Sequence, residues 1–152
     1  MGSLDKIKPS TNSLTKWIAK YPGPYVISYK LDGASALLCK KNNKVSIYTR
    51  GDGKIGKDVS HILKYINLDT SKLNEGDAIR GELMISKTNF AKIENEMANS
   101  RNAVPGMLRK KKPEPEMLKL VDFVPYWVLN PPMKQTEQMK YIEKKNFATK
   151  YV

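Results

Sequence analysis

Apolar positions along this chain repeat with two different periods. The helical period of i, i+3, i+4 and i+7 first occurs near the N-terminus, at Leu14, Trp17, Ile18 and Tyr21. A helix is therefore predicted there, capped by Asn12 or Ser13 and stopped at 21–24, where two prolines flank a glycine. Further helices are predicted over 58–66, after a cap at Thr88, and over 135–145.

Short runs of β-branched and aromatic residues predict strands over 25–30, 34–40, 45–49, 78–84 and 121–129. The turn 41–44 between the second and third runs contains two asparagines, which tolerate positive φ, so these runs form a predicted hairpin. Strands interspersed with short helices indicate an α+β fold, here an antiparallel sheet with flanking helices. With 152 residues the chain has room for one domain, predicted to span 1–152.

The chain is strongly basic. Lysine and arginine number 27 against 15 aspartates and glutamates, for a formal net charge of +12. Such a field attracts polyanions, of which nucleic acid is the commonest inside cells, whereas binding to a membrane surface normally requires a basic amphipathic helix. No apolar run approaches the roughly 20 residues of a membrane span. The net charge alone is also compatible with a soluble protein that is merely rich in lysine.

The cysteine and histidine content narrows the chemistry. Cys39 is the only cysteine and lies in the apolar run 36–39, which predicts a core thiol in a reducing compartment, cytoplasmic or nuclear. His61 is the only histidine, so the sequence offers no cluster of His and Cys for zinc. Residues 1–6 contain no apolar signal segment.

Three stretches carry candidate chemistry. The predicted strand 25–30 ends at Lys30, and a turn follows. This arrangement places an amine at the edge of a sheet, where it can reach a phosphorus or carbonyl centre of a ligand. The loop 50–56 contains three glycines, which let backbone N–H groups approach a phosphate, although the spacing fits neither the P-loop nor the dinucleotide fingerprint. The segment 98–109 combines asparagines and arginines suited to gripping a ligand.

Taken in order, these pieces resemble the adenylation (nucleotidyltransferase) domain of the NAD-dependent DNA ligases, above all the divergent ligases of large DNA viruses. Lys30-Leu31-Asp32-Gly33 resembles the family's nucleophile motif, and Thr49-Arg50-Gly51-Asp52-Gly53 its Thr-Arg-Gly-Asp-Gly stretch. Arg80-Gly81-Glu82 resembles its Arg-Gly-Glu motif. The segment 99–109 is similar to its Asn-Pro-Arg-Asn-Ala-x-x-Gly-x-Leu-Arg segment. Ser3-Leu4-Asp5 and the aromatic run 123–126 match further positions.

The resemblance implies a nucleotidyltransferase core of the ATP-grasp-like ligase type and a three-step reaction. The lysine amine attacks the α-phosphorus of NAD, expels nicotinamide mononucleotide and keeps AMP through a phosphoramidate bond. AMP then passes to the 5′-phosphate of a nick in double-stranded DNA, and the neighbouring 3′-hydroxyl displaces it. NAD is thus the implied AMP donor, Mg²⁺ the implied metal ion and nicked DNA the implied partner in replication or repair.

The resemblance also implies residue roles. Lys30 is the nucleophile, and Asp32 orients it or the magnesium. Glu82 holds the ribose hydroxyls, and Tyr126 stacks on adenine. The rest of the implied nucleotide site consists of Ser3, Leu4, Ser28, Leu31 and Arg50. Contacts to phosphate or to the nicked strand are implied for Arg50, Asn99, Arg101, Asn102 and Arg109.

Several of these residues have a plainer interpretation. Glu82 could pair with Arg80 or a lysine on a neighbouring strand. Tyr126 and Trp127 alternate, so one is expected to face the core, and a shifted register would leave Tyr126 merely packing. Capping or loop shaping is the plainer role for Asn99, Asn102 and Asp52.

The chain also departs from the family pattern. Ser28 stands where the family usually carries a glutamate facing adenine, and Ser100 and Pro105 are milder departures. The family's small N-terminal domain, its later Asp/Glu-Gly-Val-Val-Ile-Lys and lysine motifs and its oligonucleotide-binding fold lie outside these residues. We therefore expect a truncated adenylation domain: a fragment, part of a split ligase completed by a second polypeptide, or a reduced protein, with weak or no nick sealing by itself.

Two other functions are compatible with the residues. An ATP-dependent ligase or capping-type nucleotidyltransferase shares Lys-x-Asp-Gly, but the stretches 49–53 and 99–103 favour the NAD branch. A non-catalytic module that binds nucleic acid would also carry a net charge of +12. In that case no AMP would attach to the chain, and Lys30→Ala would leave nucleic-acid binding unchanged.

Overall fold

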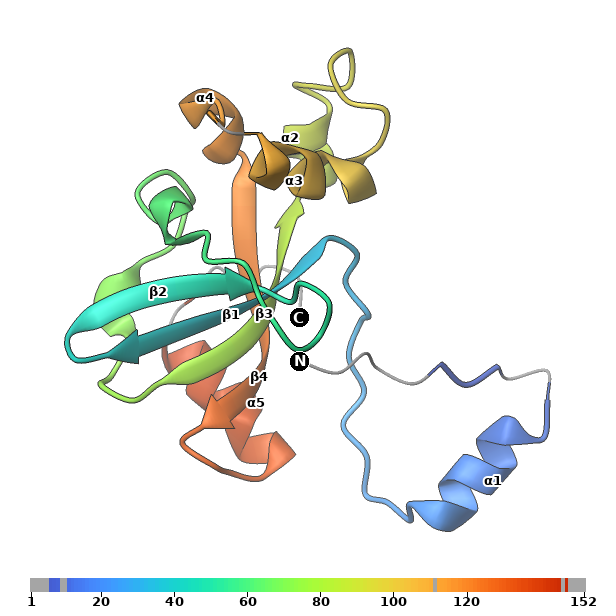
Figure 1. The fold of residues 1–152 in the computed structure, drawn as a ribbon. Coiled ribbons are helices and arrows are strands. Elements are labelled where there is room, and N and C mark those ends of the chain that lie inside the picture. Colours follow the sequence, from blue (N-terminus) through green and yellow to red (C-terminus); the bar gives the residue numbers. More distant parts are fainter. Residues whose placement is uncertain (1–5, 9–10, 111, 146, 148–152) are drawn as a thin grey trace.

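A four-stranded antiparallel sheet forms the centre of the computed structural model, which describes residues 6–8, 11–110, 112–145 and 147 (Figure 1). Its strands lie in the order β2-β1-β3-β4. They span Lys44–Thr49 (β2), Ala34–Lys41 (β1), Ala78–Ile85 (β3) and Val121–Asn130 (β4). The antiparallel α+β architecture predicted from the sequence is confirmed.

The hairpin between β1 and β2 forms as its asparagines predict. Asn42 and Asn43 adopt φ values of 52° and 57°, the positive pair that a tight two-residue hairpin requires. The carboxylate of Glu75 accepts hydrogen bonds from the backbone N–H groups of both residues. This contact fastens the hairpin to the loop that leads into β3.

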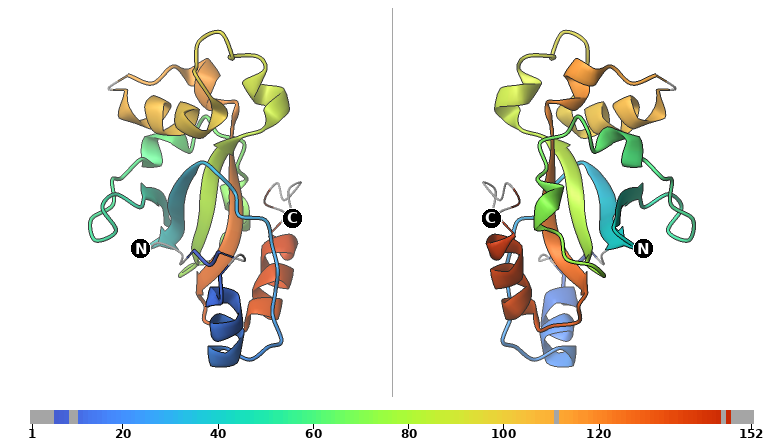
Figure 2. Two further views of the ribbon diagram at one scale, coloured as in Figure 1. Left: turned by 90° about the vertical axis from the view of Figure 1, so that its right-hand side faces the viewer. Right: turned by 90° about the vertical axis from the view of Figure 1, so that its left-hand side faces the viewer.

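One face of the sheet builds the core. Ala36 and Leu38 on β1 stand beside Gly81 and Ile79 on β3, and Phe123 on β4 packs beneath Gly81. Three short helices cover one end of the sheet: α2 (Lys87–Phe90), α3 (Ser100–Arg109) and α4 (Pro115–Leu118) (Figure 2). The helix α5 (Gln135–Lys144) packs against β4 toward the other end. The core is therefore shared between the sheet and α3, whose buried residues are Ala103, Val104, Met107 and Leu108.

Two predicted helices are shorter than expected. Over 58–66 only a 3-10 turn forms, η1 (Ser60–Ile62), although Val59, Ile62 and Ile66 are buried as the pattern requires. The helix expected to begin at Thr88 is capped instead by Ser86, whose hydroxyl accepts the N–H of Asn89 at 3.1 Å. A second 3-10 turn, η2 (Thr70–Lys72), precedes β3.

The N-terminal apolar segment differs most from its prediction. The helix α1 (Ser13–Lys20) forms, but none of its residues is buried, and Figure 1 shows it beside the sheet rather than on it. The strand predicted over 25–30 is wrong: this segment is extended but pairs with no described strand. A strand requires a hydrogen-bonded neighbour, and the described residues do not supply one for this segment. Its side chains therefore remain in solvent: Ile27 is 93% and Tyr29 83% exposed.

Cys39 is not the core thiol that its apolar surroundings predicted. Ala36 and Leu38 point into the core, so the alternation of side chains along β1 turns Leu37 and Cys39 to the other face, where both are half-buried. This partial burial, with a smaller contribution from the charge of Asp58, raises the pKa of the thiol. Within the described residues no helix is long and apolar enough to cross a bilayer.

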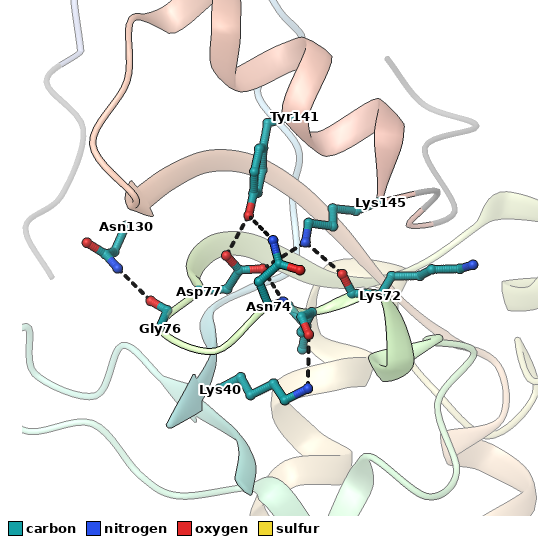
Figure 3. A network of polar contacts seen from close by, with 9 residues as sticks. Lys40, Lys72, Asn74, Gly76, Asp77, Asn130, Tyr141 and Lys145 are labelled. Carbon is teal, nitrogen blue, oxygen red and sulfur yellow. Dashed lines mark hydrogen bonds and ion pairs between the residues drawn. The ribbon is translucent and has the colours of Figure 1, made fainter. Parts of the chain in front are cut away.

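A buried carboxylate joins the loop before β3 to the end of α5 (Figure 3). Asp77 is 2% exposed and accepts a hydrogen bond from the Tyr141 hydroxyl at 2.6 Å. Its other oxygen accepts the N–H of Asn74 at 2.8 Å and lies 3.2 Å from Nζ of Lys145. Lys145 also donates to the carbonyl of Lys72 at 2.7 Å. These contacts position the first residues of β3.

Candidate functional site

A pocket of about 400 Å³ lies on the face of the sheet opposite the core. We call it the Lys30 pocket; its walls are formed by Ser28, Tyr29, Lys30, Leu31, Ser35, Arg50, Arg80, Glu82, Tyr126, Trp127 and Gln135. These residues come from the segment before β1, from the strands β1, β3 and β4, from the loop after β2, which supplies Arg50, and from the first residue of α5. Residues separated by about a hundred positions in the chain therefore share one cavity.

Lys30 reaches this pocket because the turn after it is held against β3. The N–H of Gly33 donates to Oε1 of Glu82 at 3.1 Å. A Cβ at Gly33 would lie 2.3 Å from the carbonyl oxygen of Leu83, so only glycine allows this approach. Lys30 is an exposed residue and lines the pocket. A primary amine thus stands beside a carboxylate in a concave site.

Glu82 is the buried acid of the pocket. Its side chain points away from the core because β3 alternates, and the residue is 9% exposed. Burial raises its pKa above the usual value, while the Gly33 N–H and the charge of Lys30 act in the opposite direction. Burial is the largest of these causes. The carboxylate is therefore easier to protonate than an exposed glutamate.

Tyr126 and Trp127 both line the pocket, so the expectation that one of them faces the core is wrong. The register between β3 and β4 shifts after Arg80, which pairs with Trp127, whereas the next residue, Gly81, pairs with Pro125. Tyr126 is therefore left as the extra residue of a β-bulge. Simple alternation fails at such a bulge. Trp127 remains 40% exposed, and the Tyr126 hydroxyl lies 3.1 Å from Oγ of Ser35.

The glycine loop 50–56 closes one side of the pocket through Arg50. The N–H of Arg50 donates to the carbonyl of Ser35 at 3.1 Å. Gly51 has φ +57°, and a Cβ there would collide with the carbonyl of Ile55. Asp52 shapes the loop, because its carboxylate accepts the N–H groups of Lys54 at 2.8 Å and Ile55 at 2.7 Å. These hydrogen bonds, that of Ile55 first, lower the pKa of Asp52.

Some predicted site residues do not line the pocket. Asp32 pairs instead with Arg101, whose Nε lies 3.2 Å from Oδ1, with side chains 58% and 73% exposed. Asn99 caps α3 by accepting the N–H of Asn102 at 2.9 Å, in agreement with its plainer interpretation. Arg109 ends α3 and is exposed. The predicted contacts at Ser3 and Leu4 lie outside the described residues.

Five pocket residues received no role from the sequence: Tyr29, Ser35, Arg80, Trp127 and Gln135. Ser35 is a single polar side chain in an apolar run. Arg80 lies two positions before Glu82 on the same strand, and this spacing could have placed both side chains on one face of the sheet. Trp127 lines the pocket together with Tyr126 because of the bulge, which no local sequence pattern indicates. For Gln135 no pattern pointed to the pocket, because it enters as the first residue of α5.

The site has few candidates for holding a metal ion. No group of three or more His, Cys, Asp or Glu side chains with the geometry of a metal site occurs in the part of the chain that the structure describes. Asp32 and Glu82 interact electrostatically with each other, and Lys30 acts on the same carboxylate of Glu82. Two carboxylates suit Mg²⁺ only when a substrate phosphate completes the coordination, as is usual for this ion.

Comparison with known proteins identifies a family and several relatives that cover most of the chain. Residues 3–151 match the family model of the NAD-dependent DNA ligase adenylation domain. The DNA ligase of Acanthamoeba polyphaga mimivirus is 47% identical over 151 residues, which cover 94% of this chain and 23% of that protein. The 205R protein of Invertebrate iridescent virus 6 is 36% identical, covering 97% of the chain and 25% of the relative. The DNA ligase of Lactobacillus helveticus is 35% identical, covering 93% and 23%.

These matches include both viral and bacterial proteins, and the viral resemblance inferred from the motifs is confirmed. The chain spans about a quarter of the length of each of these relatives. A family model that covers nearly the whole chain, together with motif residues that meet in one pocket, leads to one conclusion. The chain belongs to the NAD-dependent DNA ligase adenylation domain family.

Proposed function

We propose that this chain is the nucleotidyl-transferring part of an NAD-dependent DNA ligase. The observation that carries this proposal is the convergence of Lys30, Arg50, Glu82 and Tyr126 on one pocket. Each comes from a different motif or strand, and together they offer an amine, a guanidinium, a carboxylate and an aromatic ring. These are the groups that hold and attack an adenine dinucleotide.

Within the pocket the roles follow from chemistry and position. Tyr126 stacks on the adenine, and Ser28 and Leu31 line the same space. Glu82 accepts hydrogen bonds from the ribose hydroxyls, since an ionised carboxylate has acceptor capacity only. Arg50 lines the same pocket and neutralises phosphate oxygens.

The transfer step forms one bond and breaks one. The neutral amine of Lys30 attacks the α-phosphorus of NAD, a P–N bond forms, and the bond from phosphorus to the bridging oxygen breaks. Nicotinamide mononucleotide leaves with the electron pair, and the amine proton passes to solvent. AMP remains on Lys30, ready for the 5′-phosphate of a nick. Charge neutralisation and positioning carry most of the catalysis in such phosphoryl chemistry.

Asp32 would hold Mg²⁺ together with the substrate phosphates, and the ion would supply charge neutralisation at the phosphorus. For Asp32 this role requires its ion pair with Arg101 to open, which an exposed pair permits at little cost. Release from Asp32 would free Arg101 for a phosphate. Arg101 and Arg109 lie on α3 together with Asn102, and we assign this helix, with its cap Asn99, to the nicked strand.

The net charge of +12 supports double-stranded DNA as the partner. A second polypeptide that carries the remaining ligase domains is part of the proposal. So is action in a reducing compartment, cytoplasmic or nuclear.

Incubation with Mg²⁺ and either NAD or ATP tests the proposal directly. We expect intact mass spectrometry to show one added AMP with NAD and none with ATP, because the chain belongs to the NAD-dependent family. An adduct formed from ATP alone would instead identify an ATP-dependent ligase or capping-type enzyme. No adduct with either nucleotide would favour a non-catalytic module that binds nucleic acid.

Glu82→Gln should weaken nucleotide binding and remove a pH dependence. Only the ionised carboxylate of Glu82 accepts from both ribose hydroxyls, and its pKa is raised by burial. Affinity for AMP should therefore fall on acidification at a higher pH than for an exposed glutamate. Loss of one charged hydrogen bond corresponds to a decrease in affinity of about 10- to 100-fold at neutral pH.

Titration calorimetry between pH 5 and 8 measures this effect. The variant should bind weakly and should keep only the pH dependence that comes from the AMP phosphate itself, whose second pKa is about 6. Glu96→Gln is the matched control, because Glu96 is exposed and lies outside the pocket. Equal pH dependence in the parent and in Glu82→Gln would exclude this role for Glu82.

A further inference from the structure

Ser35 connects three parts of the Lys30 pocket. It lies near the start of β1, directly opposite Glu82 on β3. Its carbonyl accepts the N–H of Arg50 at 3.1 Å, which fastens the glycine loop. Its hydroxyl lies 3.1 Å from the Tyr126 hydroxyl on β4 and accepts a hydrogen bond from Nε of Arg80 at 3.4 Å. One short side chain therefore contacts two of the pocket's other walls.

A serine hydroxyl can make both contacts at once, because it has one donor and two acceptor lone pairs. The Tyr126 ring is consequently held at two places. Ser35 holds its hydroxyl, and the guanidinium of Arg80 lies near the ring, with Cζ 5.8 Å from the centroid. Arg80 is itself 8% exposed and so has little freedom to move.

The contact between the Ser35 and Tyr126 hydroxyls matters because Tyr126 is the extra residue of the bulge. A bulged residue is left out of the regular ladder, so its orientation depends more on its side-chain contacts than that of a paired residue. An aromatic platform binds a base well only when its ring is held in the stacking orientation before the ligand arrives. The Ser35 hydroxyl supplies such a constraint, and the shorter of its two contacts is the one to Tyr126.

We propose that Ser35 is a positioning residue that holds the Tyr126 ring in the orientation in which the adenine of the nucleotide stacks. The inference rests on the proposed function, because it takes an adenine nucleotide as the occupant of the pocket. Ser35 touches neither the reacting amine nor the phosphorus in this arrangement. Its loss should therefore weaken nucleotide binding and leave the rate of transfer at saturating NAD nearly unchanged.

Ser35→Ala and Ser35→Thr test this role, with Ser71→Ala as the matched control at an exposed serine outside the pocket. The probe is AMP, which has no leaving group and cannot react with Lys30. NMR of ring-labelled tyrosine reports the Tyr126 ring in the free protein, and its signals are assigned from Tyr126→Phe. Titration of the same samples with AMP gives the affinity.

We expect Ser35→Ala to shift or broaden the Tyr126 ring signals and to raise the Kd for AMP about 2- to 10-fold, the worth of one neutral hydrogen bond. Ser35→Thr, which keeps the hydroxyl, should restore both readouts, and Ser71→Ala should change neither. The apparent KM for NAD should rise by the same factor, while the rate at saturation stays within about 2-fold, as for an interaction of equal strength in ground state and transition state. The effects of Ser35→Ala and Tyr126→Phe on affinity should not add, because each removes the same hydrogen bond.

Unchanged ring signals or unchanged AMP affinity in Ser35→Ala would overturn the proposal, as would full additivity with Tyr126→Phe or the absence of AMP binding by the parent. The proposed function fails by a different result, the lack of an AMP adduct after incubation with NAD. If AMP binding and the ring signals respond as expected in a protein that forms no adduct, Ser35 positions a nucleotide that is bound but not transferred.

Discussion

Lys30→Ala is expected to abolish attachment of AMP, lowering the yield of adduct by about 1,000-fold or more, as is usual when a covalent nucleophile is removed. The side chain of Lys30 lines the pocket that contains Glu82 and Tyr126. The turn behind it is fixed by the hydrogen bond from Gly33 to Glu82 at 3.1 Å. Alanine leaves this frame in place but offers no lone pair to attack the phosphorus. Intact mass after incubation with NAD and Mg²⁺ measures the loss.

Lys30→Arg separates the charge of the residue from its nucleophilicity. A guanidinium keeps the positive charge but is not deprotonated in proteins, so it too should form no adduct while AMP still binds within about 3-fold of the parent affinity. Lys44→Ala is the control, because Lys44 is exposed at the hairpin turn, at the far end of the β1–β2 ladder from Ser35. This variant should load AMP as the parent does. Parental loading of Lys30→Ala would assign the nucleophile to another residue.

Much of the pocket could be predicted because many of its residues lie at regularly paired positions of the antiparallel strands. Arg80 and Glu82 are two apart on one strand, so they share a face whatever the rest of the fold does. The asparagine pair at 42–43 fixes the hairpin that brings β2 beside β1, and Arg50 follows directly after β2. Local rules therefore suffice for these positions.

The rest depends on interactions that a single stretch of sequence does not contain. The segment 25–30 has strand composition, but a strand also requires a neighbour, and its exposed Ile27 and Tyr29 show that composition alone does not decide. Tyr126 enters the pocket through a bulge, where alternation gives the wrong face. Ser35 gains a role only because β4 brings the Tyr126 hydroxyl within 3.1 Å of it.

Asp77→Ala is expected to lower the free energy of unfolding by about 3–5 kcal/mol, the usual cost of removing one partner from a buried ion pair. For a chain of this length, that loss corresponds to a fall in Tm of about 6–20 °C. The variant leaves the amine of Lys145, whose side chain is 9% exposed, without its carboxylate. It also deprives the Tyr141 hydroxyl and the Asn74 N–H of their acceptor (Figure 3). Thermal unfolding monitored by circular dichroism gives the change.

Two further variants identify the cause of that loss. Glu143→Ala, at an exposed position of α5, should change Tm by no more than about 2 °C, as surface substitutions usually do. Lys145→Met combined with Asp77→Ala should be more stable than Asp77→Ala alone, because it removes the unpaired buried charge. A double variant as unstable as the sum of the two single changes would show that the pair is not coupled.

The same network predicts a loss of stability in alkaline solution. Burial and the neighbouring Asp77 raise the pKa of Tyr141 from 10.0 to about 12. Between these two values the unfolded chain releases the phenolic proton while the folded protein retains it, so the contribution of this group is complete below pH 10 and is lost as the pH rises toward 12. Tyr141→Phe should therefore lose less stability than the parent over this interval. Because Asp77 precedes the strand that carries Arg80 and Glu82, the yield of AMP adduct should fall only at the pH at which the loss of stability unfolds the protein.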